Sequence, residues 1–149
     1  MFPFKKILCP TDFSEPSYEG LKWALQLAQH FGAELSIIHV IPISPALGEA
    51  AVTFHVAEYE TSARADVEHR FQELFQQRIP AGMQVRRIIS HGDAATEIVR
   101  VASEEQMDVI VIATHGLTGW RHLVFGSVAE KVVRLATCPV LTVRAPQPQ

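Results

Sequence analysis

The amino-acid sequence predicts an α/β fold, in which a five-stranded parallel sheet carries helices on both faces. Short apolar and β-branched runs alternate along the chain with stretches whose apolar residues recur at helical spacing. Strands and helices that alternate in this way form a parallel sheet joined by right-handed crossovers. A chain of 149 residues has the length of one domain, so we expect residues 1–149 to form a single domain.

The first third of the chain predicts a strand, a helix and a second strand. Lys6 to Pro10 is a short apolar run that is followed by a polar turn. Ser14 is placed to cap the helix and Gly32 to end it. Ala33 to Ile41 is apolar and β-branched, as in a buried strand. The expected inner face of the helix consists of Tyr18, Leu21, Leu25 and Ala28.

The middle third begins with an unusual connection. Pro42 to Val56 contains prolines and a glycine without sustained periodicity, which predicts a long irregular segment. A helix is expected from Ala57 to Ile79, because apolar residues recur on one face. Val85 to Ser90 predicts the third strand, and its two arginines favour a place near an edge of the sheet.

The last third predicts two helices and two strands. Asp93 is placed to cap a helix that faces inward through Ile98, Val101 and Ala102. Val109 to Ala113 is the most continuously apolar strand, and we expect it to be the most central. A final helix from Ser127 to Thr137 precedes a last strand from Pro139 to Val143. The expected inner face of that helix consists of Val128, Val132, Leu135 and Ala136.

The composition excludes several classes of function. The net charge is −3 and no basic block is present, so the electrostatic signature of a nucleic-acid-binding protein is missing. No apolar run reaches the roughly 20 residues of a membrane-spanning helix. The first residues do not resemble a secretory signal. We therefore expect a cytoplasmic protein that binds neither nucleic acid nor membrane.

The loop after the first strand carries an acidic residue. In parallel sheets, ligands bind outside the carboxyl ends of the strands, where the strand order reverses. Asp12 follows such a strand, and its carboxylate could accept hydrogen bonds from a ribose or hold a water on Mg²⁺. The alternative is a local turn, in which Asp12 or Ser14 satisfies nearby backbone groups.

The stretch from Ile112 to Ser127 has the order strand, glycine-bearing loop, helix start. A helix start leaves backbone N–H groups unpaired and suits an anion such as phosphate. The stretch matches neither the P-loop nor the G-x-G-x-x-G pattern. Ser127 and Glu130 could instead form a capping box. His115 could contact a base or a phosphate, or could be a structural donor.

Several segments together resemble the universal stress protein family. They are Lys5-Lys-Ile-Leu-Cys-Pro-Thr-Asp-Phe-Ser14, Leu35-Ser-Ile-Ile-His-Val40, His91-Gly92, Thr114-His-Gly116, Gly126-Ser-Val-Ala-Glu130 and Cys138-Pro-Val-Leu-Thr-Val143. The resemblance spans nearly the whole chain. It implies a Rossmann-like three-layer sandwich with strand order 3-2-1-4-5, in which the first and fourth strands are neighbours.

The resemblance also implies a ligand site. The ATP-binding branch of the family carries G-x2-G-x9-G-[S/T], which this chain matches at Gly116, Gly126 and Ser127, with Ala113 in place of the first glycine. The implied ligand is ATP, or ADP or AMP, with Mg²⁺ bound through the phosphates as an option. No catalytic or metal-binding residue is assigned. The implied site consists of Pro10, Thr11, Asp12, Val40, Ile112, Ala113, His115, Gly116, Gly126, Ser127 and Val128.

The last strand has the character of an interface. Val140 to Val143 is apolar and would form an exposed sheet edge, which is an aggregation hazard unless it is paired. The resemblance implies a homodimer through this strand. The expected function is that of a cytoplasmic, adenine-nucleotide-binding regulator that responds to stress or energy state, with a protein partner of unknown identity. The alternatives are a dimeric interaction module without nucleotide, and a slow ATP hydrolase.

Overall fold

The computed structural model describes residues 2–43, 52–115 and 125–146, with the backbone alone at 52–57. Its elements are β1 (Lys6–Pro10), α1 (Glu15–Phe31), β2 (Glu34–Ile41), α2 (Val52–Arg78), β3 (Val85–His91), α3 (Ala94–Glu104), β4 (Val109–Ala113), α4 (Ser127–Leu135) and β5 (Val140–Val143). The strands are parallel and lie in the order β3-β2-β1-β4-β5. The predicted fold class and strand order are confirmed.

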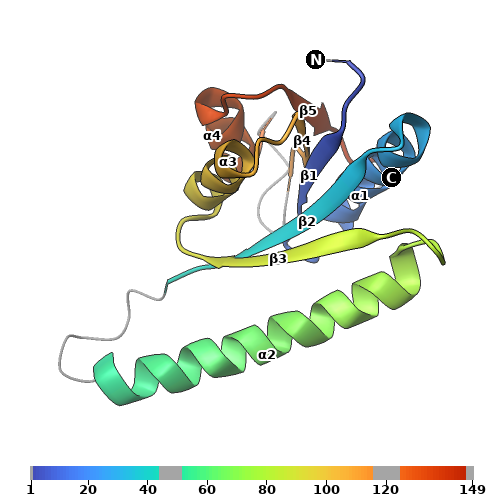
Figure 1. Cartoon of the computed structure of the whole chain (residues 1–149). Coiled ribbons are helices and arrows are strands. Elements are labelled where there is room, and N and C mark those ends of the chain that lie inside the picture. The colour runs from blue at the N-terminus through green and yellow to red at the C-terminus, as the bar shows by residue number, and fades with distance from the viewer. Residues whose placement is uncertain (1, 44–51, 116–124, 147–149) are drawn as a thin grey trace.

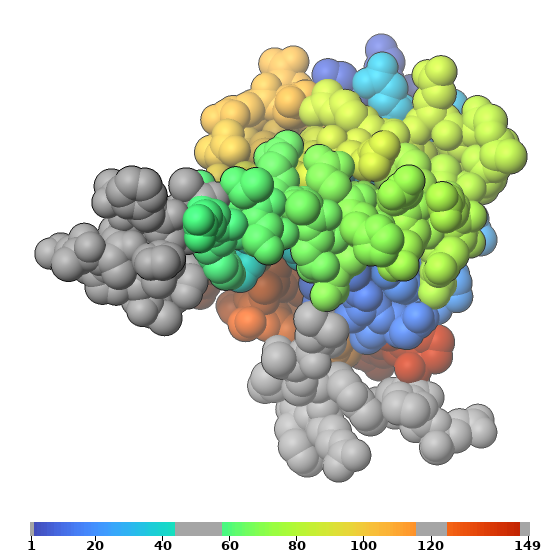
Figure 2. Space-filling view, turned by 90° about the horizontal axis from the view of Figure 1, so that it is seen from below, coloured from blue at the N-terminus to red at the C-terminus, as the bar shows by residue number. Residues whose placement is uncertain are grey.

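The helices cover both faces of the sheet (Figure 1). On one face α1 and α2 pack against the strands through residues such as Leu21, Leu25 and Phe71. On the opposite face α3 and α4 pack through Ile98 and Val132. Figure 2, which views the molecule from below, shows α2 in green with the surface of α1 in blue along one side. These layers leave the two ends of the sheet, rather than its faces, for a ligand.

Local signals explain how α1 begins and ends. The side chain of Ser14 accepts a hydrogen bond from the backbone N–H of Ser17, as an N-cap does. Gly32 adopts the left-handed conformation with φ 64°, and its N–H donates to the carbonyl of Ala28. The predicted cap and the predicted stop of this helix are both confirmed.

Two predicted boundaries differ from the structure by more than one residue. Helix α2 begins at Val52 rather than at Ala57, so the predicted irregular connection from 42 to 56 is too long. Of that connection, residues 44–51 lie outside the described part of the chain. Helix α4 ends at Leu135 rather than at Thr137, because the backbone of Ala136 is extended, with ψ 141°. The chain then needs few residues to enter β5.

The predicted inner face of α4 is partly wrong. Val128 and Leu135 are 38% and 45% exposed, whereas Val132 is fully buried. Ala129, which the sequence analysis did not select, is 3% exposed. The helix meets α3 through its small residues, so its larger apolar side chains remain outside. The packed face of this short helix therefore consists of Ala129 and Val132.

The two edges of the sheet have different surfaces. Arg86 and Arg87 on β3 are exposed at one edge, as predicted. At the other edge, Leu141 of β5 is 38% exposed. Charged side chains protect an edge from pairing with another chain, whereas apolar ones do not. Within the residues that the structure describes, no helix has the length and apolar character needed to cross a membrane.

Candidate functional site

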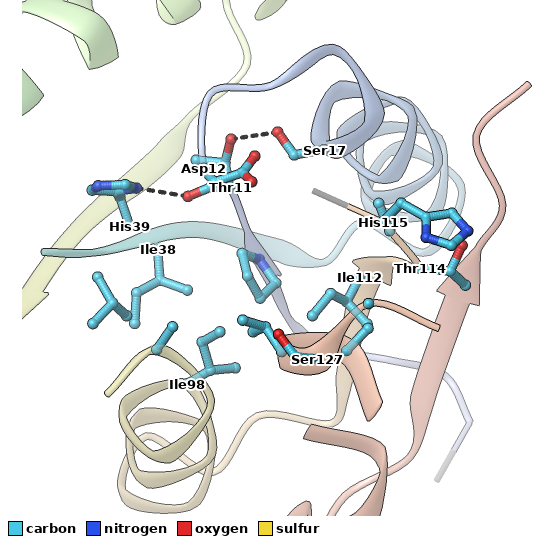
Figure 3. A pocket seen from close by; sticks show the side chains of 17 residues that line it. Thr11, Asp12, Ser17, Ile38, His39, Ile98, Ile112, Thr114, His115 and Ser127 are labelled. Carbon is cyan, nitrogen blue, oxygen red and sulfur yellow. Dashed lines mark hydrogen bonds between the residues drawn. The ribbon is translucent and has the colours of Figure 1, made fainter. Parts of the chain in front are cut away.

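A cavity of about 190 Å³ lies at the carboxyl ends of the central strands. It is bordered by residues of β1, β2 and β4 and by the first turns of α3 and α4 (Figure 3). The strand order reverses between β1 and β4, and this reversal is where parallel sheets bind ligands.

The cavity brings together every predicted site residue that the structure describes. These residues are Pro10, Thr11, Asp12, Val40, Ile112, Ala113, His115, Gly126, Ser127 and Val128. Gly116 lies outside the described residues. The cavity is also lined by residues that were not predicted from the sequence, namely Ser17, Ile38, His39, Ala94, Ile98, Thr114 and Ala129. Several of these directly adjoin predicted residues, whereas Ala94 and Ile98 line the cavity only because α3 packs beside β2.

The hydroxyl of Thr11 is fully engaged within the protein. The hydroxyl of Ser17 donates to the carbonyl of Ser14 at 2.8 Å, so it accepts from the Thr11 hydroxyl, 2.9 Å away. The oxygen of Thr11 in turn accepts the N–H of Phe13 at 3.0 Å. This side chain therefore shapes the loop between β1 and α1.

Asp12 forms the local turn that the sequence analysis offered as an alternative. Its Oδ1 accepts the backbone N–H of Ser14 at 3.0 Å and also the Ser14 hydroxyl. These bonds tie the carboxylate to the residue that caps α1. The turn orients the carboxylate at the cavity wall.

An aromatic contact braces the same loop from the side. Phe13 has a positive φ of 61°, which is uncommon for a residue with a bulky side chain. Its ring lies 4.7 Å from the ring of His39 and 5.2 Å from that of Phe71. His39 Nδ1 donates to the carbonyl of Thr11 at 2.8 Å. Burial lowers the pKa of His39, against the opposing effect of that hydrogen bond. The α2 helix thus helps to hold the loop through Phe71.

The start of α4 has no side-chain cap. The N-cap residue is Gly126, which has no side chain to accept a hydrogen bond from the first turn of the helix. Ser127 is the first helical residue, so the predicted capping box of Ser127 and Glu130 is wrong. The first N–H groups of a helix have no partner within it and carry partial positive charge. Because residues 126–129 line the cavity, this helix start can receive an anion.

The start of α3, at the same end of the sheet, is already occupied. Asp93 accepts the N–H of Thr96 at 3.0 Å and the ammonium of Lys131 at 2.9 Å. Hydrogen bonds from Thr96 and Lys131 lower the pKa of Asp93 to about 2. A carboxylate therefore neutralises this helix end, and α4 offers the better place for an external anion.

Ala113, the departure from the family pattern, lies against α1. A β-carbon built on Gly20 of α1 would be 3.7 Å from the β-carbon of Ala113 and 3.1 Å from its backbone nitrogen. The methyl group of Ala113 is therefore accommodated beside a glycine. Val111 lies two residues before Ala113 in β4, so their side chains point to the same face of the sheet, where Val111 packs in the core.

The described residues contain no group of three or more histidine, cysteine or acidic side chains that could hold a metal ion. A divalent cation at this site would depend on oxygens that the ligand itself supplies.

Comparison with known proteins identifies relatives along the whole chain. The model of the Universal stress protein family matches residues 3–144. Universal stress protein MJ0531 of Methanocaldococcus jannaschii is 35% identical over an alignment of 150 positions, which covers 97% of this chain and 84% of the relative. A solved structure of MJ0577, a universal stress protein of the same organism, is 28% identical and superposes with a TM-score of 0.80. The match covers 97% of this chain and 99% of the MJ0577 chain.

Two more distant structures contain nucleotides. A universal stress protein in complex with cAMP is 22% identical, with a TM-score of 0.70 over 95% of this chain and 97% of its own. An Arabidopsis thaliana family member with AMP bound is 19% identical, with a TM-score of 0.64 over 95% of this chain and 92% of its own. At these identities the similarity shows a common fold.

Proposed function

The chain belongs to the universal stress protein family, and from this premise we propose that it binds an adenine nucleotide in the cavity between the Asp12 loop and the start of α4. The protein would act as a cytoplasmic homodimer whose nucleotide state reports stress or energy supply. ATP, ADP and AMP are the candidate ligands, and any Mg²⁺ would be bound through the phosphates.

The open start of α4 is the observation that carries the proposal. Gly126 supplies no capping side chain, and the neighbouring α3 start is neutralised by Asp93. A phosphate group beside Ser127 would accept the first N–H groups of α4 and gain from the helix dipole. Gly116 would border the same phosphates, as the family pattern implies.

The opposite part of the cavity suits a nucleoside. Val40, Ile38 and Ile98 are buried apolar residues that line it, and a purine ring has two apolar faces to pack against such side chains. Thr11 and Asp12 border the same space (Figure 3), where the Asp12 carboxylate could accept ribose hydroxyls. The structures with cAMP and AMP show that two proteins of this fold contain adenine nucleotides.

Calorimetric titration with ATP, ADP and AMP tests the proposal. Ser127→Asp places a carboxylate at the first position of α4, where a helix tolerates negative charge but an anionic ligand is repelled. Val133→Asp places the same charge on the same helix, at a residue that is 46% exposed and does not line the cavity. We expect only Ser127→Asp to abolish binding. Absence of affinity below the millimolar range in the unsubstituted protein would contradict the proposal.

We propose binding rather than turnover. Phosphoryl transfer needs an oriented nucleophile and positive groups placed at the developing charge. Asp12, which could act through a metal-bound water, has Oδ1 engaged by Ser14. An ATPase assay with Mg²⁺ separates the two functions: a rate that Asp12→Ala abolishes would favour the hydrolase. An interaction module without a nucleotide would bind none of the three ligands.

The homodimer is proposed to form through β5. This strand ends the sheet, and its Leu141 is 38% exposed on an edge without charged residues. A second copy that paired with this edge would cover it. Leu141→Lys should shift the mass measured by light scattering from dimer to monomer. Tyr59→Lys is the matched control, since Tyr59 is 43% exposed on α2, beyond the other edge. A monomeric unsubstituted protein would refute the interface.

A further inference from the structure

Thr114, the residue after β4, has a buried hydroxyl without a hydrogen-bond partner among the residues that the structure describes. Thr114 is 5% exposed and lines the cavity. Across the described part of the chain, its Oγ1 and the Nδ1 of the adjacent His115 are two of the few buried side-chain atoms that lack a partner. Buried polar groups in proteins are nearly always paired, so an unpaired one requires an explanation.

Thr11 provides an internal comparison. It also lines the cavity, is 6% exposed and follows β1, the strand next to β4. Its hydroxyl contacts both Ser17 and the N–H of Phe13. The same residue type at the same end of neighbouring strands is thus fully paired in one case and unpaired in the other. The location at this end of the sheet therefore does not explain why the Thr114 hydroxyl is unpaired, because the Thr11 hydroxyl has a similar location and is paired.

The position of Thr114 indicates what its hydroxyl could contact. The carbonyl of Thr114 accepts the N–H of Gly126, the N-cap of α4. The residue is therefore adjacent to the helix start, which has no side-chain cap. Thr114 lines the same cavity as Gly126 and Ser127. An anion at the start of α4 would therefore lie beside Thr114.

We infer that the Thr114 hydroxyl donates a hydrogen bond to a phosphate oxygen of the bound nucleotide, and so selects phosphorylated adenosine over adenosine. The ligand takes the place of the partner that the hydroxyl lacks in the protein. The hydroxyl would then act together with the first N–H groups of α4, and the nucleoside would make its contacts elsewhere in the cavity. This inference rests on the proposed nucleotide binding and adds a specificity-determining residue to it.

Titration of AMP and of adenosine into the protein and two variants tests this role. Thr114→Val keeps the shape of the side chain and removes the hydroxyl, whereas Thr114→Ser keeps the hydroxyl. We expect Thr114→Val to weaken AMP binding about tenfold, as for the loss of one hydrogen bond to a charged oxygen. Adenosine binding should not change, and Thr114→Ser should retain most of the affinity for AMP.

Thermal unfolding without nucleotide supplies an independent measurement. Thr114→Val should not lower the melting temperature and should raise it slightly, because a methyl group replaces an unpaired buried hydroxyl. Thr11→Val should lower it, because the N–H of Phe13 loses its acceptor and the oxygen of Ser17 loses the hydrogen bond that Thr11 donates. A lower melting temperature for Thr114→Val would show that the hydroxyl is paired within the protein and would overturn the inference.

The outcomes separate this inference from the proposed function. If the unsubstituted protein binds AMP and Thr114→Val binds it equally well, the role of Thr114 is wrong while nucleotide binding stands. If Thr114→Val weakens AMP and adenosine to the same extent, the hydroxyl does not contact the phosphate. If the unsubstituted protein binds neither ligand, the proposed function fails and the inference fails with it.

Discussion

A β-carbon on Gly126 would lie 2.9 Å from the carbonyl oxygen of Thr114, and the N–H of Gly126 donates to that same oxygen. The two residues join the end of β4 to the start of α4 at the cavity. The glycine is required here by close backbone approach rather than by its conformation, since its φ is −67°.

Gly126→Ala should therefore destabilise the fold and weaken ligand binding together. The added methyl group meets a backbone atom that cannot rotate away, and overpacking of this kind costs about 1–3 kcal/mol. Denaturant unfolding measures the cost. Ser127→Ala is the control, and it should change the free energy of unfolding by less than about 0.5 kcal/mol, because Ser127 is not the N-cap. A large loss of unfolding free energy on Ser127→Ala would indicate that the Ser127 side chain caps α4.

Ala113→Gly restores the glycine of the family pattern and should leave nucleotide affinity unchanged. Ala113 borders the cavity, but the methyl group that is removed lies beside Gly20 of α1, so we expect little change in the space around the ligand. Stability should fall by about 1 kcal/mol, because a strand residue loses its packing and gains backbone entropy in the unfolded chain. A clear gain in AMP affinity on calorimetric titration would show that the methyl group crowds the ligand instead.

The sequence predicted the layers of this protein better than the chemistry of its cavity. Apolar runs such as that from Val109 to Ala113 are uninterrupted, so the core strands could be identified. The prediction that this strand is the most central is wrong, because β1 lies in the middle of the sheet. The exposure of Val128 and Leu135 could not be predicted, because in the short α4 several helical faces fit the apolar pattern equally well.

Sequence patterns could not predict that the hydroxyls of the two cavity threonines differ in their hydrogen bonding. Whether the hydroxyl of Thr11 or of Thr114 is paired depends on which groups the folded chain places within 3 Å. Ser17, in the first turn of α1, meets Thr11 across the loop that follows β1. The pairing of Lys131 with Asp93 joins α4 to α3 and depends on how those helices pack.

Asp93 should make the stability of the protein depend on pH in the acidic range. Its pKa falls from 3.8 to about 2 on folding. Its contribution is therefore present above about pH 4 and is lost as the pH falls toward 2. The carboxylate is exposed, so solvent reduces the benefit. Asp93→Ala should cost about 1 kcal/mol at pH 7 through loss of the N-cap.

Asp93→Asn separates the cap from the charge. Asparagine caps a helix about as well as aspartate does, but it has no charge to attract Lys131. The unfolding free energy of Asp93→Asn should lie near that of the unsubstituted protein at pH 7. Between pH 4 and 2 it should not show the decrease that the titration of Asp93 causes. If urea unfolding shows the same slope in both proteins, the lowered pKa of Asp93 does not contribute to it.

His39 should make the protein less stable as the pH falls below neutrality. Burial lowers its pKa in the folded state, whereas in the unfolded chain the imidazole titrates near its ordinary value of about 6.5. The unfolded state therefore binds a proton more readily, and stability is lost as the pH falls through that value. His39→Asn removes this titration and also the ring that contacts Phe13. It should cost about 1–2 kcal/mol at pH 7.5, and the cost should shrink toward pH 5. Urea unfolding of both proteins across this range measures the difference. A cost that grows toward pH 5 would mean that protonated His39 stabilises the fold through its bond to the Thr11 carbonyl.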